Sequence, residues 1–263
     1  MKVIRAENLS KTYRIHEKPE GFRSSIKDFF HRKYVYKEAV AGLSFSMREG
    51  EVIGLLGENG AGKTTTLKML SGILYPSGGS VSVMGEEPWK RNREFLKKIA
   101  FVMGNKSDMN WDLPAVDTFA YQKLLYDIPE QEYRESLKRL TEMLRLDTIL
   151  LNTQVRRLSL GERMKVELVN SFLYSPRLIF LDEPTIGLDI GSQDAIREFI
   201  REYRQKKGAS ILLTSHDMDD IENTCDRILV LKKGKLAYAL DVEELKKKSG
   251  SFRETMKGLL EGE

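Results

Sequence analysis

The chain has 263 residues, 41% of them hydrophobic and 31% charged, which is enough for one substantial core with an appended subdomain. Its 43 basic and 39 acidic residues leave a formal net charge of +4, too small an excess to indicate nucleic acid as a partner. A single cysteine, Cys225, excludes a disulfide framework within the chain. No uncharged apolar stretch approaches the roughly 20 residues of a membrane-spanning helix, so a role at a membrane would require docking on another component.

Strands and helices are expected to alternate along the chain. Short apolar or alternating runs predict strands over residues 3–9, 40–47, 51–56, 80–83, 99–102, 178–181, 210–214 and 227–231. Helical patterns are expected over residues 63–71, from about 113 to 174, and over 193–207. The run 178–181 is apolar throughout, which is typical of a strand buried on both faces of a sheet. This alternation predicts an α/β fold with a mostly parallel sheet and an inserted helical subdomain over about 105–175.

A glycine-rich loop follows the predicted strand 51–56, fits the pattern GxxxxGK[ST] and opens a predicted helix. It comprises Gly57, Glu58, Asn59, Gly60, Ala61, Gly62, Lys63 and Thr64. Glycines let the backbone wrap closely around phosphates, and the N–H groups at the start of the helix supply positive potential. We predict that Lys63 reaches the β- and γ-phosphates, that Thr64 ligates Mg²⁺, and that Thr65 contacts the α-phosphate. The alternative is a glycine-rich turn that binds nothing.

Polar residues follow two further predicted strands. Asp182 and Glu183 end the strand 178–181, and because ligands bind beyond the carboxyl ends of parallel strands, we expect both beside the nucleotide. Asp182 would hold Mg²⁺, and Glu183 would position or deprotonate the attacking water. His216 follows the strand 210–214 and could donate a hydrogen bond to the γ-phosphate. We therefore predict Glu183, His216 and Lys63 as catalytic residues, against the alternatives of a solvated acidic loop and a structural histidine.

Residues 158–163, Leu-Ser-Leu-Gly-Glu-Arg, lie between the glycine-rich loop and the carboxylates. Here the sequence resembles the nucleotide-binding subunits of ABC transporters, whose signature LSGGQ precedes a helix and the strand of the carboxylates. The resemblance runs from about residue 3 to 240 and includes a stretch at 184–189 similar to the D-loop of the family. It implies a P-loop NTPase fold with an antiparallel β subdomain, and two ATP sites at a head-to-tail dimer interface.

In that arrangement Ser159 and Gly161 of one subunit face the γ-phosphate held by the other. The same residues also allow a simpler interpretation, because Ser159 and Glu162 have the spacing of a helix capping box. Leu160 stands where the family has its first glycine, and Glu162 where it has glutamine. These departures predict weaker affinity on the signature side, for which Arg163 could compensate.

Two further site residues are implied by the resemblance. Asn105 or Gly104 stands near the position of the Q-loop glutamine, and the Asn105 amide would contact the metal or a water. Tyr13 resembles the aromatic residue that stacks on adenine, with a core aromatic at a strand end as the alternative.

The resemblance implies an ATPase that uses ATP and Mg²⁺, pairs with a second ATPase subunit, and drives separate membrane-spanning permease subunits from the cytoplasmic face of the membrane. No nucleic acid is expected as a partner. Residues 88–90 and 111–114 are similar to the exporter branch that handles drugs, antibiotics or polysaccharides. The alternatives are a soluble non-transport ABC ATPase and a regulatory ATP-binding module without turnover.

The ABC ATPase domain is expected over residues 1–240, with its core at 1–104 and 176–240, and a C-terminal helical tail over 241–263. An insertion at 15–38 lengthens the first hairpin. It holds a basic segment that predicts either an amphipathic helix for a membrane or partner, or a short helix packed on its own sheet. The apolar face of that segment comprises Phe22, Ile26, Phe29 and Phe30.

Overall fold

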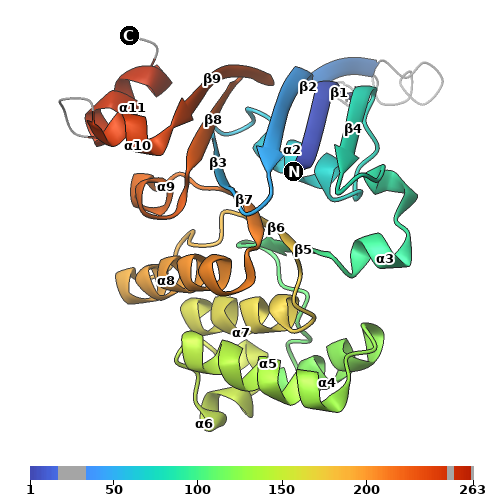
Figure 1. Ribbon diagram of the computed structural model, residues 1–263, viewed down its shortest axis with the longest axis vertical. Helices are drawn as coiled ribbons and strands as arrows, with labels where there is room; N and C mark the ends of the chain where they lie inside the picture. The colour runs from blue at the N-terminus through green and yellow to red at the C-terminus, as the bar shows by residue number, and fades with distance from the viewer. Residues whose placement is uncertain (17–33, 248–251, 262–263) are drawn as a thin grey trace, which may run out of the picture.

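The computed structural model describes residues 1–16, 34–247 and 252–261. Within these residues the strands form a three-stranded and a six-stranded sheet (Figure 1). The smaller sheet is antiparallel, in the order β2-β1-β4, and comprises Lys2–His16 (β1), Tyr34–Arg48 (β2) and Gly78–Val83 (β4). Both strands of its hairpin are longer than the sequence predicts. The expected amphipathic segment, with Phe22 to Phe30, lies outside the described residues.

The larger sheet has the order β5-β6-β7-β3-β8-β9 and is parallel except for its last strand, which pairs antiparallel with β8. Its strands are Val52–Leu56 (β3), Ile99–Met103 (β5), Leu178–Asp182 (β6), Ser210–Thr214 (β7), Arg227–Lys232 (β8) and Lys235–Asp241 (β9). Every residue of β3, β6 and β7 is buried, as expected for strands covered on both faces. Because these three strands are neighbours and parallel, the loops at their carboxyl ends share one edge of the sheet.

The helices surround this sheet. Their bounds are Lys63–Leu70 (α2), Arg93–Leu96 (α3), Ala115–Leu125 (α4), Glu130–Met143 (α5), Thr148–Leu151 (α6), Leu160–Phe172 (α7), Ile190–Lys207 (α8), Met218–Thr224 (α9), Val242–Lys247 (α10) and Phe252–Glu261 (α11), with short 3-10 helices at Pro88–Lys90 (η1) and Val155–Arg157 (η2). Figure 1 shows α4, α5 and α6 gathered at one end of the molecule, and α10 and α11 at the other. The predicted fold class is confirmed: a mostly parallel α/β core, an antiparallel sheet and an inserted group of helices.

Capping residues determine where two of the helices begin. Helix α8 begins before the predicted residue 193 because Asp189 caps it, accepting a hydrogen bond from the Ser192 N–H at 2.9 Å. The capping box that the simpler interpretation of Ser159 and Glu162 predicts at α7 is present: Ser159 Oγ accepts from the Glu162 N–H at 3.2 Å, and Glu162 accepts from the Ser159 N–H at 2.8 Å. Among the described residues, no helix has the length and apolar character to cross a bilayer.

The C-terminal helices belong to the packed core. Their buried side chains join the cluster that also holds residues of β6 and β7, and they are Val242, Leu245, Phe252 and Met256. Arg253 of α11 donates two hydrogen bonds to the carboxylate of Asp219 on α9, at 2.8 and 2.9 Å. The segment that the sequence predicted as a C-terminal helical tail is therefore attached to the helix that follows His216.

Replacing Met256 with alanine tests this packing. The side chain is 0% exposed, so the Met256→Ala variant should lose about 2–5 kcal/mol of unfolding free energy because it leaves a cavity. Urea denaturation followed by circular dichroism gives the value. The exposed neighbour provides the control, since Glu254→Ala should cost at most about 1 kcal/mol. Equal midpoints for the two variants would show that α11 does not pack as described.

Candidate nucleotide-hydrolysis site

The loop between β3 and α2 can be built only with glycine at its turning points. Gly57, Gly60 and Gly62 have φ angles of 149°, 82° and 103°. A Cβ on Gly57 would lie 2.3 Å from the Leu231 carbonyl oxygen, and one on Gly62 would lie 2.4 Å from that of Ala39. The backbone therefore passes through a space that no side chain could share, and it brings the first turn of α2 to the edge of the sheet.

A pocket of about 480 Å³ opens in front of this loop. Its lining includes most of the predicted nucleotide contacts, and comprises Tyr13, Arg14, Ile15, Lys37, Ala39, Asn59, Gly60, Gly62, Lys63, Thr64, Thr65 and Glu183. Tyr13 reaches it from β1, with its hydroxyl 3.5 Å from Thr65 Oγ1. We call this space the Lys63 pocket. Backbone N–H groups at a helix start beside a lysine and hydroxyls fit a phosphate chain, and an aromatic ring at the far side fits a base.

Lys63 lies at the floor of the pocket and is only 5% exposed. Its Nζ donates to the carbonyl oxygens of Gly57 at 2.6 Å and Glu58 at 3.2 Å, and lies 3.5 Å from His216 Nε2. Burial lowers the pKa of Lys63, and the negative charges of Glu183 and Asp182 act in the opposite direction. An ammonium whose partners are neutral carbonyl oxygens and an imidazole nitrogen is available to bind the more strongly charged oxygens of a phosphate.

Asp182 joins the loop to the strand ends. Its Oδ1 accepts hydrogen bonds from Thr64 Oγ1 at 3.0 Å and from Thr214 Oγ1 at 2.8 Å. The predicted metal ligands Thr64 and Asp182 are therefore in direct contact. A hydroxyl and a carboxylate beside a phosphate pocket fit Mg²⁺, which favours oxygen ligands and takes several of them from water and substrate. Thr214 is the residue of this group that the sequence did not single out, because it reads as an ordinary strand position.

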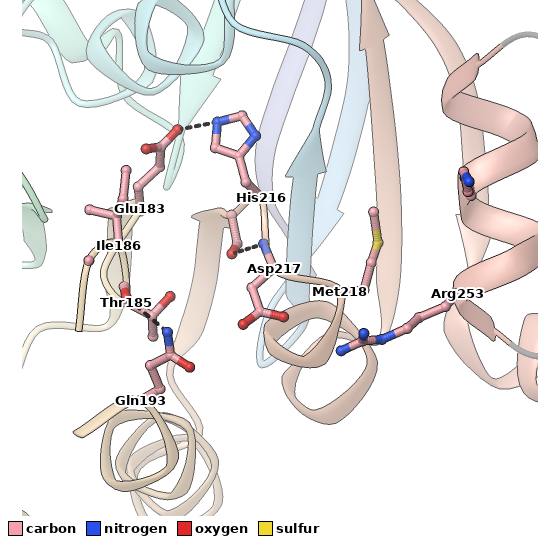
Figure 2. A pocket seen from close by; sticks show the side chains of 11 residues that line it. Glu183, Thr185, Ile186, Gln193, His216, Asp217, Met218 and Arg253 are labelled. Carbon is pink, nitrogen blue, oxygen red and sulfur yellow. Dashed lines mark hydrogen bonds and ion pairs between the residues drawn. The ribbon is translucent and has the colours of Figure 1, made fainter. Parts of the chain in front are cut away.

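Glu183 has an unusual backbone. Its φ of 55° places it in the left-handed region, which non-glycine residues rarely adopt outside functional or turn positions. The Glu183 N–H donates to the carbonyl oxygen and hydroxyl of Thr214, at 3.1 and 3.0 Å. The turn directs the carboxylate toward the end of β7, where Oε1 lies 2.7 Å from His216 Nε2 (Figure 2). Two of the three predicted catalytic side chains, Glu183 and His216, thus meet across the neighbouring strand ends.

Asn105 is placed differently from the other predicted ligands. It lines a separate pocket of about 160 Å³ with Trp111, Leu160 and Arg163. The preceding residue, Gly104, packs on the backbone of Glu183, where an added Cβ would lie 2.0 Å from the Glu183 carbonyl oxygen. The loop after β5 therefore touches the catalytic turn through its glycine, and the metal contact predicted for Asn105 stays a prediction.

The predicted contacts of the signature sequence also lie apart from the Lys63 pocket. Ser159 is engaged in the capping box, and a Cβ on Gly161 would lie 2.1 Å from Ser192 Oγ. The guanidinium of Arg163 lies 4.3 Å from the ring centre of Trp111 and donates to the Leu158 carbonyl oxygen at 3.2 Å. The predicted ATP contacts thus form two separate groups on one subunit: the Lys63 pocket and the start of α7.

A second cavity, of about 630 Å³, is lined in part by Glu183 and His216. Figure 2 shows Glu183, Thr185, Ile186 and His216 around it, with Arg253 of α11 at its far edge. Helix α11 therefore approaches the loops that carry Glu183 and His216, which the sequence did not indicate.

A strand, a glycine-rich loop and a helix that present a buried lysine, together with two carboxylates at the tip of a nearby parallel strand, define a P-loop nucleoside triphosphatase. A protein family described as ABC transporter matches residues 40–186. ABC transporter ATP-binding protein NatA of Bacillus subtilis (strain 168) is 33% identical over 217 residues, which make up 82% of this chain and 87% of that protein. The chain belongs to the ABC transporter family, and it is an ATP-binding and ATP-hydrolysing subunit.

Two further comparisons agree with this family. Nod factor export ATP-binding protein I of Burkholderia orbicola (strain AU 1054) is 34% identical over 204 residues, 78% of this chain and 66% of that protein. Among solved structures, a dimeric ATP-binding cassette in a post-hydrolysis state, bound to ADP and Pi, has a TM-score of 0.74. It is 21% identical and covers 91% of this chain and 98% of its own, so it shows the shared fold.

Lys63→Ala should abolish ATP binding, because it removes the one buried ammonium that faces the pocket from α2. Isothermal titration calorimetry of the full chain with ATP measures the effect. The matched control is Lys68→Ala, on the same helix but not in the lining of the pocket, and it should bind ATP as the unaltered protein does. Unchanged affinity in Lys63→Ala would contradict the assignment of this pocket to the phosphates.

Proposed function

We propose that this ATPase acts with Mg²⁺ and a second ATPase subunit to drive membrane-spanning permease subunits of an exporter, from the cytoplasmic face of the membrane. The observation that carries the hydrolytic part is the contact of 2.7 Å between Glu183 Oε1, which lines the Lys63 pocket, and His216 Nε2, which lies 3.5 Å from Lys63 Nζ. That contact favours turnover over a purely regulatory ATP-binding module, because a base and a hydrogen-bonding imidazole stand where the terminal phosphate would lie.

Each residue has a distinct role in this proposal. Lys63 binds phosphate oxygens, and Tyr13 stacks on the base. Thr64 and Asp182 would hold Mg²⁺, whose charge, when it is bound, helps neutralise the phosphate oxygens. Glu183 orients the attacking water and accepts its proton, and His216 holds the Glu183 carboxylate and the terminal phosphate in place.

The geometry of one subunit supports pairing with a second. The Lys63 pocket is open, and Ser159 and Gly161 do not line it. Around the start of α7 the surface exposes apolar side chains, namely Leu160, Ile186 and Ile190. Exposed apolar residues that gather next to a functional site are typical of a surface that a partner covers. In a head-to-tail pair, the Ser159 and Gly161 of one subunit would complete the site of the other, and the dimeric cassette among the similar structures supports this arrangement.

A groove beside α4 supports the docking of a permease. It has a volume of about 380 Å³ and joins α4 to the ends of α2, β5 and α7. Its rim exposes Ile73, Tyr121 and Leu125, and Leu124 is exposed nearby. Asn170 and Ser171 of α7 line the same groove. A groove whose rim exposes apolar side chains, with polar groups in its lining, fits an amphipathic helix, and we propose that a cytoplasmic helix of the permease occupies it.

The export direction rests on the relatives. The sequence resembles the exporter branch, and a protein named for Nod factor export is 34% identical. The cargo would be chosen by the membrane subunits, so this chain supplies the energy and not the selectivity. The identity of the membrane chain that co-purifies with it tests the direction and the cargo class together.

Glu183→Gln should bind ATP but hydrolyse it at least about 10²-fold more slowly, because the amide cannot accept a proton. With saturating Mg-ATP this variant should therefore accumulate as a dimer, measured by size-exclusion chromatography with light scattering. Glu198→Gln, on the outer face of α8, should dimerise no more than the unaltered chain. A Glu183→Gln variant that stays monomeric would contradict the paired-site proposal.

Leu125→Asp should weaken recovery of the membrane chain by about 10-fold or more, because it introduces a charge into the apolar rim of the groove. The side chain is 52% exposed, so folding and ATP binding should be retained. Ile149→Asp makes the same kind of change at another exposed apolar residue outside the groove, and it should leave co-purification intact. Equal recovery with the two variants would rule out this groove as the docking site.

A further inference from the structure

The loops that carry the two catalytic side chains meet at one buried carboxylate beneath the site. Thr185, which follows Glu183 in the loop after β6, donates its hydroxyl to Asp220 Oδ2. Ser215, which precedes His216 in the loop after β7, donates its hydroxyl to the same oxygen atom at 2.5 Å. Asp220 lies on α9 and is only 3% exposed. A single oxygen atom therefore joins the segments on which Glu183 and His216 stand.

The other oxygen of Asp220 is held by an arginine from α8. Arg197 Nε donates to Asp220 Oδ1 at 2.7 Å, and Arg197 Nη2 donates to Asp217 Oδ2 at 2.8 Å. Arg197 is itself buried, and its positive charge offsets the cost of a buried carboxylate. Since an ionised carboxylate can only accept hydrogen bonds, both hydroxyls must point toward Asp220.

The same cluster also fixes the turn after His216. The Asp217 N–H donates to Ser215 Oγ at 2.9 Å (Figure 2). The Ser215 hydroxyl thus accepts a hydrogen bond from the backbone N–H that follows His216, and it donates one to Asp220. Both neighbours of His216 are therefore hydrogen-bonded to the buried Asp220–Arg197 pair, Ser215 to Asp220 and Asp217 to Arg197.

We propose that Asp220, oriented by Arg197, is a positioning residue that sets the separation of Glu183 and His216. This inference rests on the proposed hydrolytic roles of those two side chains. Asp220 lines neither the Lys63 pocket nor the cavity of Figure 2, so it acts only through Thr185 and Ser215. A displacement of about 1 Å at a catalytic group can cost about 10²-fold in rate, which makes such a link consequential for turnover and not for ATP binding.

The neighbouring acidic residue provides a natural contrast. Asp219 precedes Asp220 on α9, is substantially exposed and bonds to Arg253 of α11. It accepts no hydrogen bond from Thr185 or Ser215. Two carboxylates of the same helix therefore differ in whether they reach the catalytic loops, and Asp219→Asn should hydrolyse ATP as the unaltered protein does.

The donor hydroxyls allow a test that leaves the Asp220–Arg197 ion pair intact, so the result does not depend on the folding of a variant with a broken pair. Thr185→Val and Ser215→Ala should each lower kcat for Mg-ATP hydrolysis by about 10-fold or more, with KM for ATP changed by less than about 3-fold. Thr185→Ser restores the donor and should recover most of the activity. The double variant should lose less than the product of the single losses, because both hydroxyls act through the same oxygen atom.

Turnover is measured on the full chain together with its co-purified membrane chain. Thr185→Val and Ser215→Ala variants with unaltered kcat would overturn the inference, as would equal losses in Thr185→Ser and Thr185→Val. Failure of the proposed function gives a different result. If Glu183→Gln hydrolyses ATP at the unaltered rate, the roles of the catalytic pair are wrong; if turnover depends on Glu183 but not on the donors, only the positioning role of Asp220 is wrong.

Discussion

The hydrogen bonds that Asp182 accepts from Thr64 and Thr214 join three segments that are far apart in the sequence. Thr64 opens α2 after the glycine-rich loop, Asp182 ends β6, and Thr214 ends β7. The bonds are possible because β6, β7 and β3 are neighbouring parallel strands whose carboxyl ends lie at one edge. Lys63, Glu183 and His216 are placed by the same strand order. Any change that shifted β6 against β7 would separate the carboxylates from the phosphate-binding loop.

Much of this site could be predicted from short segments of the sequence. The glycine-rich loop, the acidic strand end and His216 each have a local pattern, and parallel strand order brings such patterns together. The left-handed turn at Glu183 has no such signal, since glutamate is not a residue that usually adopts it. The contacts of Asp220 were equally hidden, because they join residues on α8, α9 and two loops, and nothing in the local sequence marks them as partners.

Elsewhere the sequence was misleading or silent for similar reasons. Strand β9 was not predicted, although its residues 236–240, Leu-Ala-Tyr-Ala-Leu, form an apolar run. It is mostly exposed and, among the described residues, it pairs with β8 at the edge of the larger sheet. The C-terminal segment was predicted as a helical tail, with no sign of its packing, because only a few of its side chains, such as Phe252 and Met256, enter the core. The metal contact that family resemblance implies for Asn105 stays a prediction: Asn105 lines a pocket with Trp111, and Gly104 packs on the backbone of Glu183.

Helix α7 reaches two of the surfaces that the proposed function requires. Its start carries Ser159, which would face the nucleotide of a paired subunit, and its last turn contributes Asn170 and Ser171 to the groove beside α4. The helix has 13 residues and is therefore about 20 Å long, with backbone hydrogen bonds that resist stretching. A displacement of one end of α7 would therefore also displace its other end, because the helix moves as a rigid unit. If two subunits close around ATP, the movement of α7 would shift the groove beside α4 and with it the permease helix proposed to bind there.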